Sequence, residues 1–74
     1  MATHIIMDDT GDTRHQFDTS DPKALRQAEA RFRELTGRGF RAVALDSGNG
    51  SGKLVREFDP QIEQTLFVPQ LVGG

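Results

Sequence analysis

The chain has 74 residues, of which 35% are apolar and 27% charged, with a formal net charge of -2 and no cysteine. This length allows one domain with a compact core, and the lack of cysteine excludes disulfides, thiolate metal sites and a thiol nucleophile. The charge gives no electrostatic reason to bind nucleic acid or an anionic membrane. We find no export leader and no apolar run that could span a bilayer, and so expect a cytoplasmic protein.

A β-hairpin is predicted at the amino end of the sequence. The run "THIIM" over 3–7 is rich in β-branched residues and predicts the first strand. The following "DDTGD" suits a turn, because Gly11 can adopt positive φ and aspartate is favoured in turns. The second strand is expected over 13–18, with Phe17 as its anchor in the core.

A single amphipathic helix of about four turns is predicted next. Asp21 is a good N-cap, Pro22 suits the first helical position, and Gly37 is the expected residue that ends the helix. Apolar residues recur three or four positions apart and form one stripe that faces a core. The stripe consists of Ala24, Leu25, Ala28, Phe32 and Leu35.

The remaining residues predict three more strands, over 40–46, 54–59 and 65–68. A glycine-rich loop over 47–53 joins the first two of these strands, and a turn that begins at Pro60 precedes the last. The apolar last strand is too hydrophobic for an exposed edge, so we expect it in the middle of the sheet. The order ββαβββ, with one helix across one face of a mixed sheet, predicts an α+β protein with a β-grasp fold.

The glycine-rich loop "SGNGSGKL" invites comparison with a phosphate-binding loop, but its spacing does not fit. Ser47 stands where that motif requires glycine, and Leu54 stands where it requires Ser or Thr. The loop is also followed by a strand, so no helix N-terminus would face a phosphate. We expect a flexible turn.

Metal binding and catalysis find little support in the sequence. His4 and His15 could face each other across the first hairpin, but two histidines alone make a poor metal site, and we expect two ordinary surface histidines. The aspartates of "DDTGD" lack the ligand spacing of a calcium loop. No histidine lies near a serine or threonine in a pattern typical of a catalytic triad, so we expect no enzyme activity.

The tail "PQLVGG" directly follows the last predicted strand and closes the sequence with Gly73 and Gly74. Glycine lacks the Cβ that would collide with the walls of a narrow channel, so a carboxylate on such a strip could enter a partner's active site. The alternative is an inert terminal segment, because termini are often disordered. We divide the chain into a domain over 1–68 and an extended tail over 69–74.

The order of elements and the terminal Gly-Gly together resemble the ubiquitin-like β-grasp proteins. The stretch "LFVPQLVGG" is similar to the endings of bacterial sulfur carriers, such as the small subunit of molybdopterin synthase. The resemblance implies that an activating enzyme adenylates the carboxylate of Gly74 with ATP, and that this protein binds no cofactor itself. It also implies that the tail residues are recognised by that enzyme, namely Pro69, Gln70, Leu71 and Val72, followed by Gly73.

Two branches of this family remain open. A modifier similar to the bacterial ubiquitin-like proteins would be joined to amine groups of target proteins through an isopeptide bond, with a conjugating enzyme and a deconjugating protease as further partners. A sulfur carrier would instead receive a thiocarboxylate. We favour the modifier, and keep the sulfur carrier and a non-covalent interaction module with an inert tail as alternatives.

The resemblance also suggests where partners would dock. Because side chains alternate along a strand, Leu66 and Val68 share one face of the sheet while Phe67 lies on the other. Alignment with the tail of ubiquitin implies that Phe67 is buried and that Leu66 and Val68 form the partner surface. The alternative is that both faces of this strand are covered. Only Lys23 and Lys53 could accept a second copy through a side chain, with Lys53 expected in the exposed loop.

Overall fold

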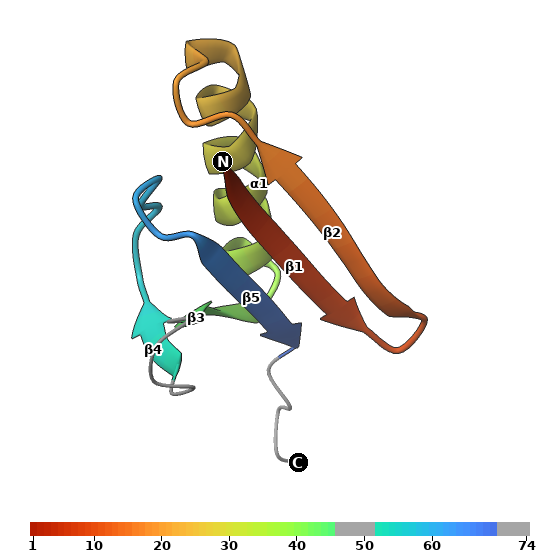
Figure 1. The fold of residues 1–74 in the computed structure, drawn as a ribbon. Coiled ribbons are helices and arrows are strands. Elements are labelled where there is room, and N and C mark those ends of the chain that lie inside the picture. The colour runs from red at the N-terminus through yellow and green to blue at the C-terminus, as the bar shows by residue number, and fades with distance from the viewer. Residues whose placement is uncertain (46–51, 70–74) are drawn as a thin grey trace.

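The computed structural model describes residues 1–45 and 52–69. Its elements follow the predicted order (Figure 1): β1 (Ala2–Asp8), β2 (Gly11–Phe17), α1 (Pro22–Gly37), β3 (Phe40–Leu45), β4 (Gly52–Val55) and β5 (Gln64–Pro69). They form a five-stranded mixed sheet in the order β2-β1-β5-β3-β4. Strand β5 is central, parallel to β1 and antiparallel to β3. The fold is a β-grasp, as the sequence predicts.

The first hairpin is confirmed, and its turn is tight. Asp8 pairs with Gly11 in the register of β1 and β2, and Gly11 has a φ of 127°, which favours glycine. The Asp8 carboxylate accepts hydrogen bonds from the backbone and the hydroxyl of Thr10, at 2.9 and 2.6 Å. These bonds, with that from the hydroxyl contributing most, lower the pKa of Asp8.

Helix α1 begins as predicted but ends later. Asp21 is the N-cap and accepts a hydrogen bond from the backbone of Lys23 at 3.0 Å. Gly37, expected as the first residue after the helix, is instead its last helical residue, and the C-cap is Arg38. The terminating glycine is Gly39, whose φ of 100° is the left-handed conformation that closes many helices. Within the described residues no helix is both long and apolar enough to cross a membrane.

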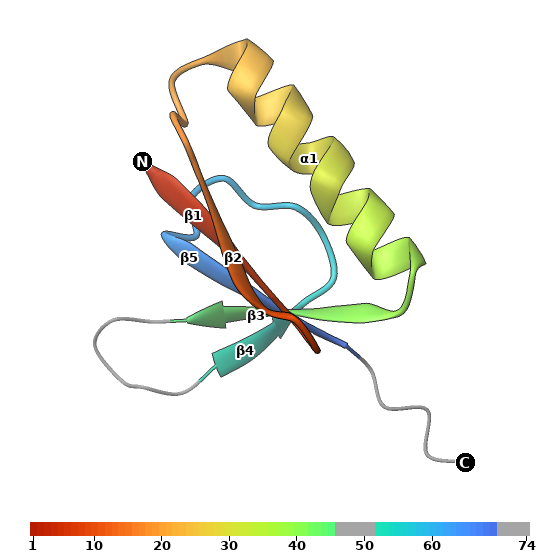
Figure 2. The same ribbon diagram turned by 90° about the vertical axis from the view of Figure 1, so that its right-hand side faces the viewer.

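Helix α1 covers one face of the sheet, which we call the covered face (Figure 2). Its buried residues are Ala28, Phe32 and Leu35. Phe32 and Leu35 pack with Ala42 and Phe67, while Ala28 packs with Ala2 and Phe17. Phe58, from the segment between β4 and β5, contacts both groups and joins them into one core.

His4 is part of this core, which corrects the expectation that it lies on the surface. Its side chain is 2% exposed, and its ring lies 4.8 Å from that of Phe17, 5.9 Å from Phe58 and 5.0 Å from Phe67, measured between centroids. The hairpin register explains this position. Ala2 pairs with Phe17, so the next inward position on β1 is occupied by His4.

Strand β4 lies earlier in the sequence than predicted. It spans Gly52–Val55, so the expected strand over 54–59 is wrong beyond Val55, and Lys53 lies in a strand rather than a loop. Continuing the pairing of Val55 with Ala42 would place Arg56 opposite Arg41, and like charges in that position are destabilising. The predicted turn after β4 is confirmed by a hydrogen bond from the Ile62 N–H to the Asp59 carbonyl at 3.2 Å.

Candidate functional site

The face of the sheet opposite α1, the open face, carries a row of apolar side chains. Ile5 of β1 pairs with Leu66 of β5, Leu66 pairs with Val43 of β3, and Val43 pairs with Leu54 of β4. Side chains at paired positions lie on the same face, within contact distance of their neighbours. We call these four residues the open-face row.

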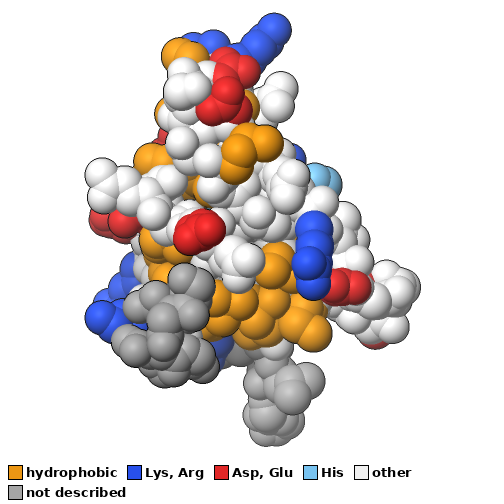
Figure 3. Space-filling view, viewed as in Figure 1, with side chains coloured by type: hydrophobic (Ala, Val, Ile, Leu, Met, Phe, Trp, Pro, Cys, Tyr) orange, Lys and Arg blue, Asp and Glu red, His pale blue; other side chains and the backbone are white. Residues whose placement is uncertain are grey.

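Exposure is lowest at the β1 end of this row and highest at the β4 edge of the sheet. Ile5 is 9% exposed, Leu66 and Val43 are half-buried, and Leu54 is 57% exposed. Met7, two residues after Ile5 on the same strand, adds another side chain that is 44% exposed. Figure 3 looks onto this face and shows hydrophobic side chains gathered beside the lower ends of β1 and β5. Contiguous apolar surface of this kind is typical of sites that bind another protein.

Charged side chains flank the open-face row. Arg14 pairs with Ile5 in the β-sheet register and makes an exposed ion pair with Asp12 at 3.6 Å. Arg41 pairs with Val68, and it makes no ion pair with any described residue. An apolar centre with a charged rim is the usual composition of a protein interface.

The two predicted surface residues, Leu66 and Val68, are both half-buried and lie on the open face. Phe67 between them is 0% exposed and belongs to the core. The alternation predicted for this strand is therefore present. The continuation of the row through Ile5, Val43 and Leu54 was not predicted. The apolar character of both faces of "FRAVAL" in β3 could have indicated a second apolar surface.

Strand β5 ends at one end of the sheet with Pro69, which is exposed and pairs with Phe40. Pro69 was expected in the tail but is the last residue of the strand. The other tail residues expected to be recognised or activated lie outside the described residues. They are Gln70, Leu71, Val72, Gly73 and Gly74.

Both candidate acceptor lysines are exposed. Lys23 lies in the first turn of α1, and Lys53 lies on β4 opposite Ala44.

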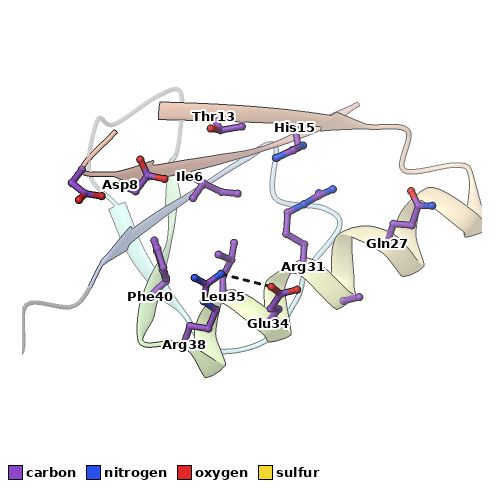
Figure 4. A pocket seen from close by; sticks show the side chains of 12 residues that line it. Ile6, Asp8, Thr13, His15, Gln27, Arg31, Glu34, Leu35, Arg38 and Phe40 are labelled. Carbon is purple, nitrogen blue, oxygen red and sulfur yellow. Dashed lines mark ion pairs between the residues drawn. The ribbon is translucent and has the colours of Figure 1, made fainter. Parts of the chain in front are cut away.

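A groove separates the β1–β2 hairpin from α1, and we call it the hairpin–helix groove (Figure 4). It has a volume of about 760 Å³ and an apolar floor of Ile6, Leu35 and Phe40. Polar side chains line its walls, and Arg31 extends from α1 toward His15 on β2. Thr13 and His15, two inward residues of β2, line the side of the groove formed by the hairpin.

Two histidines lie close to this groove and face each other in the register of β1 and β2. Burial, then the charges of Arg31 and His15, lower the pKa of His4 to about 4. Burial and Arg31 also lower the pKa of His15. Nδ1 of His4 is buried and has no hydrogen-bond partner among the described residues, and the lowered pKa keeps the imidazole neutral at pH 7.

The described residues contain no cluster of three or more side chains that could hold a metal ion. The pair His4 and His15 lies beside the positive charge of Arg31, which disfavours a cation. Most of the glycine-rich loop, the other candidate considered from the sequence, lies outside the described residues.

Comparison of the chain with family models, with curated proteins and with solved structures gives no match. Family membership is therefore not established by likeness.

Proposed function

We propose that this protein is a ubiquitin-like modifier, activated at the carboxylate of Gly74 and joined to amine groups of target proteins. The observation that carries the proposal is the position of β5. This strand ends at the exposed Pro69, at an end of the sheet, and the sequence that follows supplies Gly73 and Gly74. The folded domain would then serve as the part that partners recognise, with a reactive carboxylate beyond it.

The chemistry requires an activating partner, because a carboxylate is a poor electrophile. A carboxylate oxygen of Gly74 attacks the α-phosphorus of ATP, forming an acyl-adenylate and releasing pyrophosphate. A thiolate of the activating enzyme then attacks the acyl carbon and releases AMP. Attack by a lysine amine on this thioester forms the isopeptide bond and returns the thiol. The catalytic groups and the ATP site belong to the partners, in keeping with a domain of this size.

The open face supports this proposal by supplying a surface for such partners. The row of Ile5, Leu66, Val43 and Leu54 is apolar and partly exposed, and Arg41 lies at its rim beside Val68. Buried apolar anchors within a polar rim commonly provide most of the energy of a protein interface. We propose that the activating enzyme, and a conjugating enzyme or deconjugating protease, dock here.

Intact-mass measurement tests the function directly. The full chain is incubated with a candidate activating enzyme and ATP, in parallel reactions with a protein target and with sulfide. We expect a covalent adduct with the target that loses one water relative to the two separate proteins. Exchange of one carboxylate oxygen for sulfur would show a sulfur carrier instead, and an unchanged mass in both reactions would support a non-covalent module.

The variant Gly74→Ala sharpens this test. We expect it to unfold at the same denaturant concentration as the parent, because the site lies beyond β5, and to react much more slowly, because its Cβ obstructs a narrow channel. Equal rates for the variant and the parent would contradict a channel that requires glycine.

A further inference from the structure

The open face carries opposite charges on the two sides of its central strand, β5. On one side, Asp12 of β2 pairs with Met7 of β1. On the other side, Arg41 of β3 pairs with Val68 of β5. The parallel register of β1 and β5 places these two pairs at the same level of the sheet. Both charged side chains are exposed, and Arg41 makes no ion pair with any described residue.

A twofold axis parallel to β5 would bring these opposite charges together in two copies of the chain. Rotation about this axis turns the sheet over and exchanges its sides, so β1 of one copy lies over β3 of the other, and β5 lies over its counterpart. Stacked sheets pack about 10 Å apart with their strands nearly aligned. At this spacing Asp12 comes within reach of the second copy's Arg41, and the symmetry forms this contact twice.

The same axis matches the apolar residues of the open-face row. Ile5 would lie over the second copy's Val43, and Leu66 would lie over its own counterpart. Arg14, which pairs with Ile5, would lie over the second copy's Leu54 at the β4 end of the row. The aliphatic stem of an arginine can cover apolar surface while the guanidinium stays in water. Leu54, which is 57% exposed, would thereby be covered.

The other twofold axis that stacks the two open faces, perpendicular to the strands, fits less well. It keeps each strand over its own counterpart and exchanges the two ends of the strands. Arg14, near the middle of β2, would then face the second copy's Arg14, and like charges across an interface oppose association. Asp12 would also be moved away from Arg41. Charge therefore favours the axis along β5.

We propose that the protein forms a symmetric dimer in which two copies pack open face to open face, with the twofold axis along β5. The open face measures about 20 Å in each direction. This footprint of about 400 Å² is below the roughly 800 Å² per partner of a standard stable interface. The dimer is therefore weak, and its population depends on the protein concentration. Under the proposed function, a second copy and an activating enzyme would compete for this face.

Sedimentation velocity, measured on the full chain over a range of concentrations, tests this dimer. We expect the sedimentation coefficient of the parent to rise toward that of a dimer as the concentration approaches about 1 mM. Asp12→Arg and Arg41→Asp each create two like-charge contacts in the dimer, so each variant alone should associate at least about tenfold more weakly. The control Arg26→Asp reverses the charge of an exposed arginine on α1, away from the open face, and should associate like the parent.

An equimolar mixture of Asp12→Arg and Arg41→Asp tests the arrangement itself. In a mixed dimer the two substituted positions face each other, and so do the two unsubstituted ones. Both contacts again join opposite charges, so we expect the mixture to associate about as tightly as the parent. Circular dichroism shows that each variant is folded. The exposed ion pair with Arg14 that Asp12→Arg removes contributes little to stability.

A parent that stays monomeric at about 1 mM would overturn the proposal. A single open-face variant that associates like the parent, a mixture that stays monomeric, or equal weakening by Arg26→Asp would overturn it as well.

No activating enzyme is used in these measurements, so they are independent of the mass assay. Adduct formation by a chain that stays monomeric would remove only the dimer. A dimer without an adduct would remove only the modifier function.

Discussion

The two faces of the sheet differ in the type of side chain they carry and in its exposure. The core under the covered face is aromatic, and the ring of His4 lies edge to face with those of Phe17, Phe58 and Phe67. The open face is aliphatic, and exposure rises along its row to 57% at Leu54. Large rings fill the space between a helix and a sheet, whereas short aliphatic chains form a level surface against which another protein can pack.

The difference is sharpest along β5, where adjacent residues belong to opposite faces. Phe67 is 0% exposed and contacts Phe32 at a centroid distance of 5.7 Å. Leu66, one residue earlier, is half-buried in the open-face row. We therefore expect stability to depend mainly on one residue and partner binding mainly on the other.

The largest expected effect is that of Phe67→Ala. Removing a fully buried ring leaves a cavity, and we expect a loss of about 3–5 kcal/mol in the free energy of unfolding. The matched variant Leu66→Ala should lose about half as much or less, because part of the side chain is already in water. Urea denaturation followed by circular dichroism measures both. Should Phe67→Ala fail to fold, Phe67→Leu provides a milder truncation, and a greater loss in Leu66→Ala than in either Phe67 variant would contradict the assignment of faces.

We also expect the free energy of unfolding to decrease in acid. Because the pKa of His4 falls from 6.5 to about 4 on folding, the unfolded chain binds more protons between these two values. The contribution of neutral His4 to stability is fully present above pH 6.5 and is lost as the pH falls toward 4. The loss from this residue is about 3 kcal/mol. Urea midpoints measured between pH 7 and pH 4 test it.

The variant His4→Leu isolates this effect. It removes the titrating group and the unpaired Nδ1 at similar volume, so we expect equal or greater stability at pH 7 and a smaller fall toward pH 4. His15→Gln is the control. Because His15 is only half-buried, this variant should retain most of the loss of stability toward pH 4. An unchanged pH dependence in His4→Leu would place the acid sensitivity elsewhere.

On the open face, Leu54→Ser should separate binding from stability. Leu54 is more than half exposed, so we expect a change of less than about 0.5 kcal/mol in the free energy of unfolding. Loss of an apolar anchor should weaken binding of the activating enzyme by about tenfold. Titration calorimetry with that enzyme measures it, and unchanged affinity in both Leu54→Ser and Leu66→Ala would remove the open-face row from the interface.

The smallest effect is expected for Arg41→Gln at the rim. The side chain is exposed and has no ion pair within the described residues, so the stability should hardly change. If the partner surface is acidic, the substitution slows association and weakens its dependence on salt. Stopped-flow association at two salt concentrations measures this, with Arg56→Gln as a control. Equal effects of both substitutions would indicate general attraction rather than contact at the rim.

Local signals in the sequence were sufficient for the element order and the fold. The N-cap at Asp21 and the stripe of α1 predicted the helix, and the apolar "TLFV" predicted a central last strand. The end of the helix was placed too early, because Gly37 and Gly39 are equivalent in sequence and only the chain direction after α1 selects Gly39. Strand β4 was predicted too late in the sequence, because Phe58 was included in it. Phe58 instead packs against the core from the segment after the strand, and this packing depends on tertiary contacts.

Burial of polar residues and alignment across strands were harder to predict. A histidine within a strand usually indicates an exposed position, and His4 is buried only because the hairpin register places it between inward neighbours. That register can be derived by placing Gly11 at the turn of the hairpin and by assuming that the side chain of Phe17 faces the core. The open-face row depends on pairings among four strands, two of them far apart in sequence, and no local pattern contains that information.

The insertion of β5 between β1 and β3 has a consequence for synthesis. Until residue 69 has left the ribosome, the amino-terminal hairpin and the β3–β4 pair have no common partner, and the sheet stays in two pieces. The longest-range pairing, between β1 and β5, is also the step that orders the whole domain. A truncated chain would therefore remain open to proteolysis, and folding would act as a check that translation has reached the last strand.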